Sequence, residues 1–261
     1  MESRDVSLPV VALALGIVAT LAAYALRLFT AGGAAAALAV GAVVLLAGGW
    51  GLTVTLVGTF VGAGLLTWYR RGEKLQPEHR RGRSAAQVLA NGTVPAVAAL
   101  AGAILDSPRA LPAAVGAMAA TAADTWATEL GLLSRRMPRL ITTGAVVPRG
   151  RSGGITPLGT ASGVGGALVA AILGRLVISA STLGIAPIVT GGVAGFLVDS
   201  LLGATLQARY RCPACGQEGE AQACTCGAQR RLAGGWRWVT NDVVNIAATA
   251  VGAVVAAFLS R

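Results

Sequence analysis

Residues 123–160 read ADTWATELGLLSRRMPRLITTGAVVPRGRSGGITPLGT, and this stretch holds the pattern that decides the fold. Two carboxylates, Asp124 and Glu129, lie near the end of an apolar run. A loop rich in Arg and Gly follows, and then a second apolar run begins. A charged group inside lipid costs at least a few kcal/mol, so an acidic side chain in a membrane helix generally has a partner or a function. The stretch therefore predicts a site for a metal ion and a phosphate at the face of a membrane.

The overall composition is that of a protein with several membrane spans. Of the 261 residues, 54% are hydrophobic and only 12% are charged, which is far too apolar for a soluble domain. We therefore expect an all-α fold, a polytopic bundle of about seven or eight transmembrane helices that forms a single integral membrane domain over residues 1–261. The N-terminal sequence MESRDVSLP lacks the features of a cleavable signal, so the first span is expected to stay in the protein.

Apolar runs long enough to cross a bilayer mark the expected spans. The runs at 34–47 and 52–68 are separated by GGWG, and they are either two short spans or one span with a re-entrant piece. Eight spans would place the N-terminus outside the cell, and seven would place it inside. The expected spans are residues 6–26, 34–47, 52–68, 84–105, 111–133, 158–177, 188–207 and 239–259.

Positive charge is concentrated in three loops. Of the 21 Lys and Arg residues, 16 lie within residues 70–83, 135–151 and 209–237. Two expected helices separate each of these loops from the next, so all three fall on one side, which the positive-inside rule makes the cytosolic face of the plasma membrane. Basic clusters between spans are explained better by topology, anionic lipid and phosphate than by nucleic acid, which is not expected as a partner.

The scarcity of two residue types excludes some chemistry. Lys74 is the only Lys and follows Glu73, so the chain has no GxxxxGK phosphate-binding loop. His79 is the only His, which excludes mechanisms that need two imidazoles.

Acidic and amide side chains occur at a similar depth in four of the expected helices. Asp124 and Glu129 lie about ten and five residues before the loop, within roughly 15 Å of the cytosolic edge. Such residues can simply join helices by hydrogen bonds, but their common depth favours a shared site. The set is Asn91, Asp124, Glu129, Asp199 and Asp242, with Gln207, Asn241 and Asn245 at helical spacing nearby.

The loop that follows Glu129 carries groups suited to binding phosphate. Arg grips phosphate with two parallel N–H groups, glycines let backbone N–H groups approach oxygen, and the start of a helix favours an anion. Carboxylates for Mg²⁺ and cations for phosphates are what phosphoryl transfer requires. The alternative is a flexible loop whose arginines only set the topology. The candidates are Arg139, Thr142, Thr143, Arg149, Arg151, Ser152, Gly153, Gly154 and Thr156.

Four cysteines lie close together in the third basic loop. They form CPACG, with Cys212 and Cys215, and CTCG, with Cys224 and Cys226. This spacing favours a metal over disulfides, and four thiolates suit a closed, structural Zn²⁺ site with no open position for catalysis. Residues 209–237 are therefore expected to form a small, cytosolic zinc-knuckle-like insertion.

Several motif blocks resemble those of a known family. ADTWATELG, PRLITTG, PRGRSGGIT, DSLLGATLQ and NDVVN, together with QVLANG at 87–92, resemble blocks of the integral membrane family that contains plant phytyl-phosphate kinase and animal transmembrane protein 19. The resemblance covers residues 87–245 but neither the first three spans nor the cysteine loop. It implies CTP-dependent phosphorylation of an isoprenoid monophosphate to a diphosphate. It also implies shared polar positions at Asn91, Asp124, Glu129, Arg139, Arg149, Gly153, Asp199 and Asp242.

Together, residues and resemblance predict a membrane-embedded kinase that transfers the γ-phosphoryl group of CTP to a phytyl- or geranylgeranyl-type monophosphate. Asp124 and Asp199 are expected to hold Mg²⁺, the loop arginines to neutralise charge on phosphate, and Asp242 or Glu129 to orient the acceptor. The expected partners are membrane lipid, the isoprenoid phosphate and the nucleotide. Two alternatives stay open: a CTP-dependent cytidylyltransferase acting on a lipid phosphate with the same residues, and a lipid or solute transporter that uses the polar helices as a path.

Overall fold

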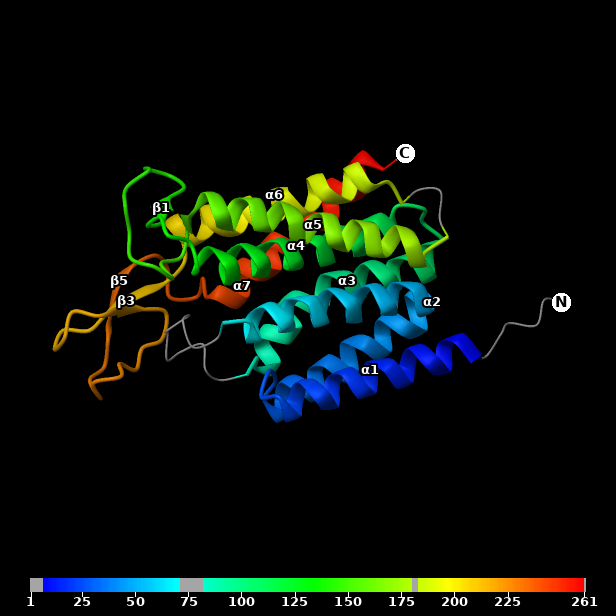
Figure 1. The fold of residues 1–261 in the computed structure, drawn as a ribbon, viewed down its shortest axis with the longest axis horizontal. Coiled ribbons are helices and arrows are strands. Elements are labelled where there is room, and N and C mark those ends of the chain that lie inside the picture. Colours follow the sequence, from blue (N-terminus) through cyan, green and yellow to red (C-terminus); the bar gives the residue numbers. More distant parts are fainter. Residues whose placement is uncertain (1–6, 71–81, 180–182, 261) are drawn as a thin grey trace.

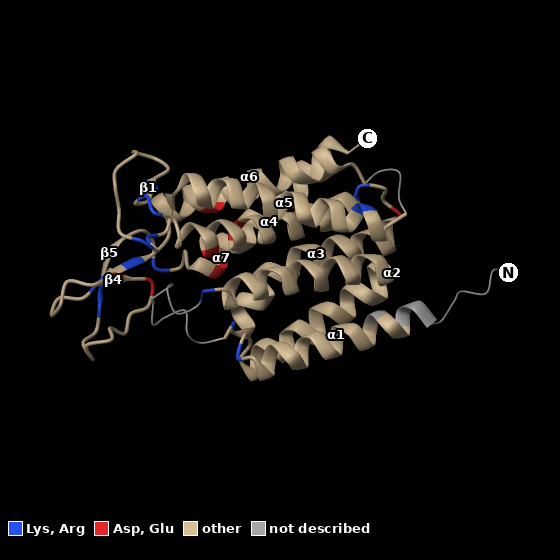
Figure 2. Ribbon diagram, in the orientation of Figure 1, with Lys and Arg blue, Asp and Glu red and all other residues tan. Residues whose placement is uncertain are grey.

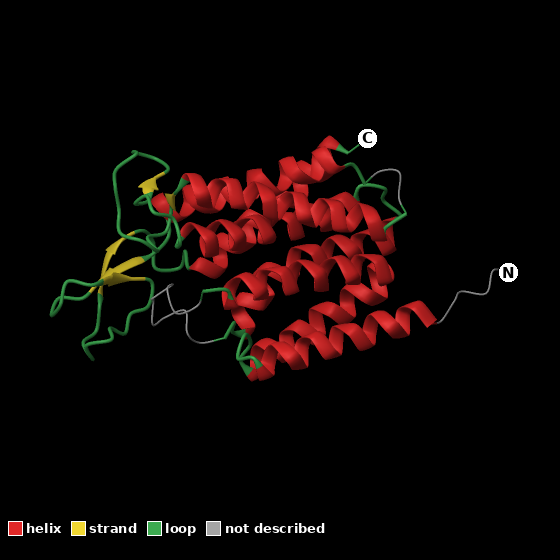
Figure 3. Cartoon of the chain, viewed as in Figure 1, coloured by secondary structure: helices red, strands yellow, loops and turns green. Residues whose placement is uncertain are grey.

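The computed structural model describes residues 7–70, 82–179 and 183–260, and in these ranges the chain is a bundle of helices with short strands at one end (Figure 1, Figure 3). The helical class expected from the composition is confirmed. The seven helices are α1 (Ser7–Ala25), α2 (Ala31–Trp68), α3 (Ala85–Leu105), α4 (Ala110–Gly131), α5 (Pro157–Val177), α6 (Ile185–Thr205) and α7 (Asn241–Leu259). The strands in the same ranges are β1 (Arg139–Leu140), β2 (Gly154–Ile155), β3 (Arg209–Arg211), β4 (Glu218–Gly219) and β5 (Arg231–Gly234).

Helix α2 folds back on itself at Gly49. This residue has φ 76° and ψ −178° inside the helix, a conformation that glycine adopts without steric cost. The two ends of α2 consequently lie at the same end of the bundle (Figure 1), and Phe29, just before α2, stacks on Phe60 with the ring centroids 4.6 Å apart. The interruption predicted at GGWG is confirmed. Each half is about 27 Å long, close to the thickness of a bilayer core, which favours two short spans over a re-entrant piece.

Five of the described helices are long and apolar enough to cross a membrane, namely α2, α3, α5, α6 and α7. Helix α4 is not among them, although the sequence predicts a span at 111–133. It packs against α2, α3, α5, α6 and α7 and buries small residues such as Ala119 and Ala123, both 0% exposed. A helix surrounded by other helices needs no apolar face toward lipid, so α4 can carry Asp124 and Glu129. The total of seven or eight spans stays a prediction.

Small residues allow the central helices to approach closely, as expected for helix packing in lipid. A Cβ atom on Gly116 of α4 would lie 2.6 Å from the Gly252 carbonyl oxygen of α7, and one on Gly195 of α6 would lie 2.6 Å from the carbonyl oxygen of Ala248. The core around these contacts contains the fully buried Val115 and Ile188. This close packing fixes α4, α6 and α7 relative to one another, and these helices carry most of the predicted acidic and amide residues.

Charged residues gather at the end of the bundle that carries the strands (Figure 2). The second and third basic loops both lie there. Residues 71–81, which hold most of the first basic loop with Glu73, Lys74 and His79, lie outside the described residues, but the helices on either side of them reach the same end (Figure 1). The second and third loops thus share one end of the bundle, and the placement of the first loop on the same side stays a prediction.

Candidate active site at the loop end of the bundle

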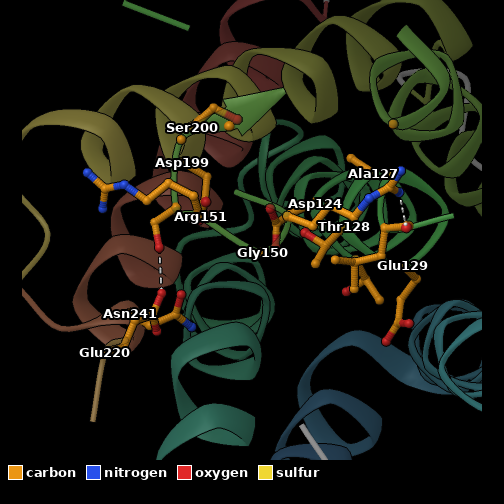
Figure 4. A pocket seen from close by; sticks show the side chains of 18 of the residues that line it. Asp124, Ala127, Thr128, Glu129, Gly150, Arg151, Asp199, Ser200, Glu220 and Asn241 are labelled. Carbon is orange, nitrogen blue, oxygen red and sulfur yellow. Dashed lines mark hydrogen bonds between the residues drawn. The ribbon is translucent and has the colours of Figure 1, made fainter. Parts of the chain in front are cut away.

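A cavity of about 770 Å³ opens at the loop end, between the helix ends and the loops that cover them (Figure 4). From the helices, and from Gln207 just beyond α6, it is lined by predicted acidic and amide residues: Asn91, Asp124, Glu129, Asp199, Gln207, Asn241 and Asn245. From the Gly-rich loop it is lined by Arg149, Arg151, Ser152, Gly153, Gly154 and Thr156. The structure thus brings together polar residues that are more than 150 positions apart in the sequence. Four predicted residues are not part of this lining: Asp242, Arg139, Thr142 and Thr143.

A pair of carboxyl groups lies at the inner end of the cavity. Asp124 of α4 and Asp199 of α6 point toward the same space (Figure 4), where the charge of Asp124 acts on Asp199. Among the described residues, Asp199 Oδ2 is a buried oxygen with no hydrogen-bond partner. Two adjacent carboxylates repel each other unless a proton or a cation lies between them. The pair therefore fits a hard divalent cation, which takes oxygen ligands.

Gln207 offers a matching donor. Its side chain is only 2% exposed and lines the cavity, and in the described part of the chain its Nε2 has no hydrogen-bond partner. A buried donor without a partner costs free energy unless a ligand or a water satisfies it. Gln207 is thus suited to bind an anionic oxygen within the cavity.

Arg83 is the cation that faces the acidic residues of α4. Burial lowers the pKa of this guanidinium, and the charges of Glu129 and then Asp124 oppose that shift. The guanidinium carbon lies 5.5 Å from the centroid of the Phe60 ring, within the range of a cation–π interaction. Arg83 lines the cavity, so it stands where a phosphate beside the carboxylates would need a positive charge.

The position of Arg83 is fixed by its backbone. Its N–H donates to the carbonyl oxygen of Leu28 at 2.8 Å, and its own carbonyl oxygen accepts from the N–H of Thr30 at 3.1 Å. Arg83 was predicted only as one of the basic loop charges and not as a residue of the site. The sequence pattern that could have placed Arg83 at the end of a helix is the capping box of Ser84 and Gln87, which starts α3 directly after Arg83.

Two predicted residues take part in hydrogen bonds between helices. Thr67 of α2 donates its hydroxyl to Glu129 Oε1 at 2.6 Å. Thr121 of α4 donates to Asn91 Oδ1 at 3.3 Å. These bonds fix α2 and α3 to α4 beside the cavity. Helix joining therefore accounts for part of what Asn91 and Glu129 do, as the alternative interpretation of these polar residues predicted.

The Gly-rich loop is folded tightly against the end of α6. Strands β1 and β2 pair in antiparallel register, with Arg139 opposite Ile155. Next to β2, Gly153 has φ 76°, and a Cβ atom there would lie 2.4 Å from the backbone nitrogen of Ala204. Only glycine fits this position. Its close approach places the loop one helical turn beyond Asp199, over the cavity.

The loop arginines have separate local roles. Arg149 Nη1 donates to the carbonyl oxygen of Leu132 at 2.8 Å, beyond the end of α4. Arg139 Nη1 donates to the carbonyl oxygen of Gly144 at 2.8 Å and closes the turn after β1. Burial, followed by the neighbouring charge of Arg209, lowers the pKa of Arg151. Arg149 and Arg151 thus line the cavity, whereas Arg139 stabilises the hairpin away from it.

Thr156, another predicted phosphate ligand, has its hydroxyl engaged as the N-cap of α5. The hydroxyl accepts from the N–H of Gly159 at 3.0 Å. The first turns of α5 and α7 both line the cavity, through Thr160 and Asn241. Two helix N-termini directed at one cavity favour an anion there.

The cysteine loop forms a small sheet in the order β4-β3-β5 and covers one side of the cavity. We call residues 209–234 the cysteine ribbon. Its four Sγ atoms all lie within 4.8 Å of one another, so they could bind one metal ion, as predicted. The backbone N–H of Cys226 is the main cause that lowers the pKa of Cys224 to about 6. This loop was predicted as a separate insertion, and its place in the lining of the site was not predicted.

An apolar groove of about 130 Å³ adjoins the cavity on the side of the N-terminal helices. Leu13 of α1, Leu38 of α2 and Met118 of α4 are among the residues that line it. Phe60, Arg83, Gln87 and Asn91 line both the groove and the polar cavity. The two spaces are therefore neighbours that share the wall around Arg83.

Comparisons with known proteins place this geometry in a family. Residues 14–253 match the family described as Integral membrane protein DUF92. The chain belongs to this family. The membership confirms the resemblance drawn from the motif blocks, and it extends the match across the first spans and the cysteine ribbon.

Relatives of this DUF92 protein occur in distant organisms. An uncharacterized membrane protein of Synechocystis is 30% identical over 243 residues, covering 88% of this chain and 82% of the relative. An uncharacterized membrane protein of Methanocaldococcus jannaschii is 42% identical over 125 residues, 48% of this chain and 52% of the relative. Protein PGR of Arabidopsis thaliana is 38% identical over 104 residues, 36% of each chain. These last two matches thus span about half and about a third of the relatives. No solved structure matches the chain.

Proposed function

We propose that this chain is a membrane-embedded kinase that transfers the γ-phosphoryl group of CTP to an isoprenoid monophosphate of the phytyl or geranylgeranyl type. The observation that carries the proposal is the Asp124–Asp199 pair, with a buried oxygen free for a cation, in one cavity with Arg83 and Gln207. Phosphoryl transfer needs carboxylates for a metal and donors for phosphate in the same place. The family resemblance supplies the choice of CTP and of an isoprenoid acceptor.

Asp124 and Asp199 would hold Mg²⁺ through their carboxylate oxygens. Bound there, the ion would neutralise charge on the nucleotide phosphates. The nucleotide would be bound from the loop side of the cavity, by Arg149, Arg151 and the N–H groups of the Gly-rich loop. Arg83 and Gln207 would position the acceptor phosphate.

The reaction requires little acid–base catalysis from the protein. An oxygen of the acceptor monophosphate attacks the γ-phosphorus, the bond from that phosphorus to the β–γ bridging oxygen breaks, and CDP leaves with the electron pair. The acceptor phosphate is already ionised near neutral pH, so no strong general base is required. Glu129, held by Thr67, would keep Arg83 in place rather than remove a proton. Positioning and charge stabilisation would then supply the rate enhancement.

The apolar groove supports a lipid acceptor. It adjoins the cavity at Arg83, so a molecule with its phosphate at that guanidinium would extend its hydrocarbon tail between α1, α2 and α3. Burial of a tail among apolar side chains is favourable by about 25 cal/mol per Å². A soluble phosphate acceptor would leave this groove unused.

The cysteine ribbon is proposed to bind one structural Zn²⁺. Pairs of its sulfur atoms are 3.6 and 3.5 Å apart, close to the roughly 3.8 Å that tetrahedral Zn–thiolate geometry requires. Metal analysis of the purified protein should give about one Zn per chain, lost when all four cysteines are changed to Ser. A metal-free protein of unchanged stability would contradict the zinc assignment.

The site is proposed to face the cytosol from the plasma membrane. The charge distribution motivates this orientation. A cysteine placed at the exposed Ala145 should resist a membrane-impermeant thiol reagent added to intact cells. One placed at the exposed Arg109, at the opposite end of the bundle, should react. The reverse result would overturn the orientation.

The activity is tested by incubating purified protein and Mg²⁺ with phytyl or geranylgeranyl monophosphate and each nucleoside triphosphate. The proposal predicts isoprenoid diphosphate and CDP in equal amounts, with CTP as the preferred donor. In a cytidylyltransferase, the acceptor phosphate would instead attack the α-phosphorus of CTP, and pyrophosphate would be released. Absence of any product with every donor would contradict the kinase assignment and favour the transporter alternative.

A further inference from the structure

The cysteine ribbon is more than an appendage, because the segment between its two cysteine pairs lines the cavity. Gln217, Glu218 and Glu220 of this segment line the cavity that contains Asp124 and Asp199. Glu220 lies only four residues before Cys224. The thiol cluster and the wall of the cavity are therefore adjacent along the chain.

The two halves of the thiol cluster are formed by matching turns. In the first, the N–H of Gly216 donates to the carbonyl oxygen of Cys212 at 2.9 Å, and in the second the N–H of Gly227 donates to that of Cys224 at 3.0 Å. Both glycines have positive φ, 73° and 86°. The turns bring the four sulfur atoms within 4.8 Å of one another, and a metal bound to them would fix the intervening segment at both ends.

Glu220 connects the ribbon to the rest of the site. Ser152 of the Gly-rich loop donates its hydroxyl to Glu220 Oε1 at 2.5 Å. The charge of Glu220 also acts on both Asp124 and Asp199. Figure 4 shows Glu220 beside Asn241, on the same cavity as the two aspartates. Together with Glu218, Glu220 is thus a carboxylate that the ribbon contributes to the cavity, in addition to Asp124, Glu129 and Asp199 of the helices.

Strand pairing and hydrogen bonds inside the ribbon hold this segment beside the cysteine turns. Arg230, which is 7% exposed, donates from Nη1 to the carbonyl oxygens of Ala221 and Ala223 at 3.1 and 3.2 Å. Thr225 donates to Gln217 Oε1 at 3.1 Å. These contacts join the segment to the cysteine turns, so the position of Glu220 depends on the turns being ordered.

We propose that a metal ion bound by the four cysteines holds Glu220 in place as a third acidic group of the cation site, so that occupancy of the cysteine cluster sets the cation affinity of the cavity. This inference rests on the cation site of the proposed function. A hard cation gains affinity with each carboxylate added to its surroundings, and residues that position the ligands matter nearly as much as the ligands. The ribbon would then couple the availability of a thiol-binding metal to phosphoryl transfer.

The test measures cation binding rather than turnover. Full-length protein in detergent is titrated with Mn²⁺ and followed by electron paramagnetic resonance, and its zinc content is measured separately. Glu220→Gln should weaken Mn²⁺ binding by about tenfold or more and keep the zinc. Glu218 also lines the cavity, but its carboxylate is paired with Arg211 at 2.6 Å. Glu218→Gln removes the same charge two residues away and should therefore change Mn²⁺ affinity by less than about threefold.

A second variant removes the metal at the cysteines but keeps the Glu220 carboxylate. Changing the exposed Cys215 and Cys226 to Ser should remove the zinc and weaken Mn²⁺ binding about as much as Glu220→Gln does. Unchanged Mn²⁺ affinity in Glu220→Gln, or in the zinc-free variant, would overturn the inference, as would a wild-type protein that binds no Mn²⁺. If the zinc-free variant does not fold, Ser152→Ala replaces it, with an expected weakening of about threefold to tenfold. Mn²⁺ binding that depends on Glu220 in a protein without kinase activity would uphold this inference and contradict the proposed function.

Discussion

The helical half of the cavity and its loop half differ in what holds their functional groups. Asp124 and Asp199 stand on helices that are packed through glycine and alanine, where a Cβ at Gly195 would already lie 2.6 Å from a neighbouring backbone oxygen. Arg151 and Glu220 stand on turns held by a few hydrogen bonds. Rigid helices suit a cation site, which needs fixed ligands. Loops suit a nucleotide, which must enter and leave.

We expect the largest effect on turnover when a carboxylate in the helical half is substituted. Asp124→Asn keeps the size and hydrogen bonding of the side chain but removes the charge that would bind the metal. Turnover should fall by at least about 10²-fold, measured as diphosphate formed by a variant that is monodisperse in detergent. Asp106→Asn is the matched control, because Asp106 caps α3 at the opposite end of the bundle with φ 48°. Near-normal turnover of well-folded Asp124→Asn would remove the metal assignment.

A somewhat smaller effect is expected for Arg83, which stands between the two halves. Arg83→Lys keeps the charge but loses the two-pronged geometry, so turnover should fall by about tenfold to 10²-fold with a raised KM for the acceptor. Arg139→Lys provides the comparison, since Arg139 bonds the Gly144 carbonyl and does not line the cavity. Equal effects of the two substitutions would show that Arg83 has no special role at the acceptor phosphate.

The loop half is tested by two glycines with similar backbone. Gly153 and Gly144 have φ of 76° and 70°, but a Cβ at Gly153 would lie 2.4 Å from Ala204 nitrogen, whereas one at Gly144 meets nothing within 4 Å. Both alanine variants lose about 1–2 kcal/mol from the left-handed conformation. Only Gly153→Ala should also displace the loop and raise the KM for CTP, by about tenfold. Similar nucleotide kinetics in both variants would contradict the packing of the loop on α6.

The smallest effect is expected in the apolar groove. Gly41 lines this groove, and a Cβ there would meet nothing within 4 Å. Gly41→Leu should fill part of the groove and raise the KM for geranylgeranyl monophosphate by about fivefold, which corresponds to about 1 kcal/mol, the lower end of the cost of extra methylene groups in a packed apolar space. The KM for a five-carbon isoprenoid monophosphate should not change. Equal changes for both acceptors would mean that the tail does not lie there.

Helical periodicity allowed the helical half to be predicted from the sequence. Each of Asp124, Asp199 and Asn91 lies a known number of residues from a basic loop. Because the rise per residue of a helix is constant, these numbers give similar depths in the bundle. The break at Gly49 was readable for a similar reason, since GGWG interrupts two apolar runs.

The loop half was predictable by residue type but not by position. Arg139 and Arg149 look alike in the sequence, yet one closes a turn and the other lines the cavity. The difference arises from the backbone carbonyl that each guanidinium reaches in the folded loop, Gly144 for Arg139 and Leu132 for Arg149. No sequence pattern indicated Glu220 as a residue of the site, because its position depends on long-range packing of the ribbon on the Gly-rich loop. The proximity of Arg83 to Asp124 and Glu129 likewise comes from packing between segments that are distant in sequence.

The central claim is that this cavity transfers the γ-phosphoryl group of CTP to a lipid monophosphate. The most direct measurement supplies purified protein with geranylgeranyl monophosphate and with CTP labelled by ³²P at either the γ- or the α-position, and then follows the label into the lipid. The account predicts that label enters the lipid from the γ-position alone and that Asp124→Asn abolishes the transfer. Label entering from the α-position, or no label entering from either, would contradict it.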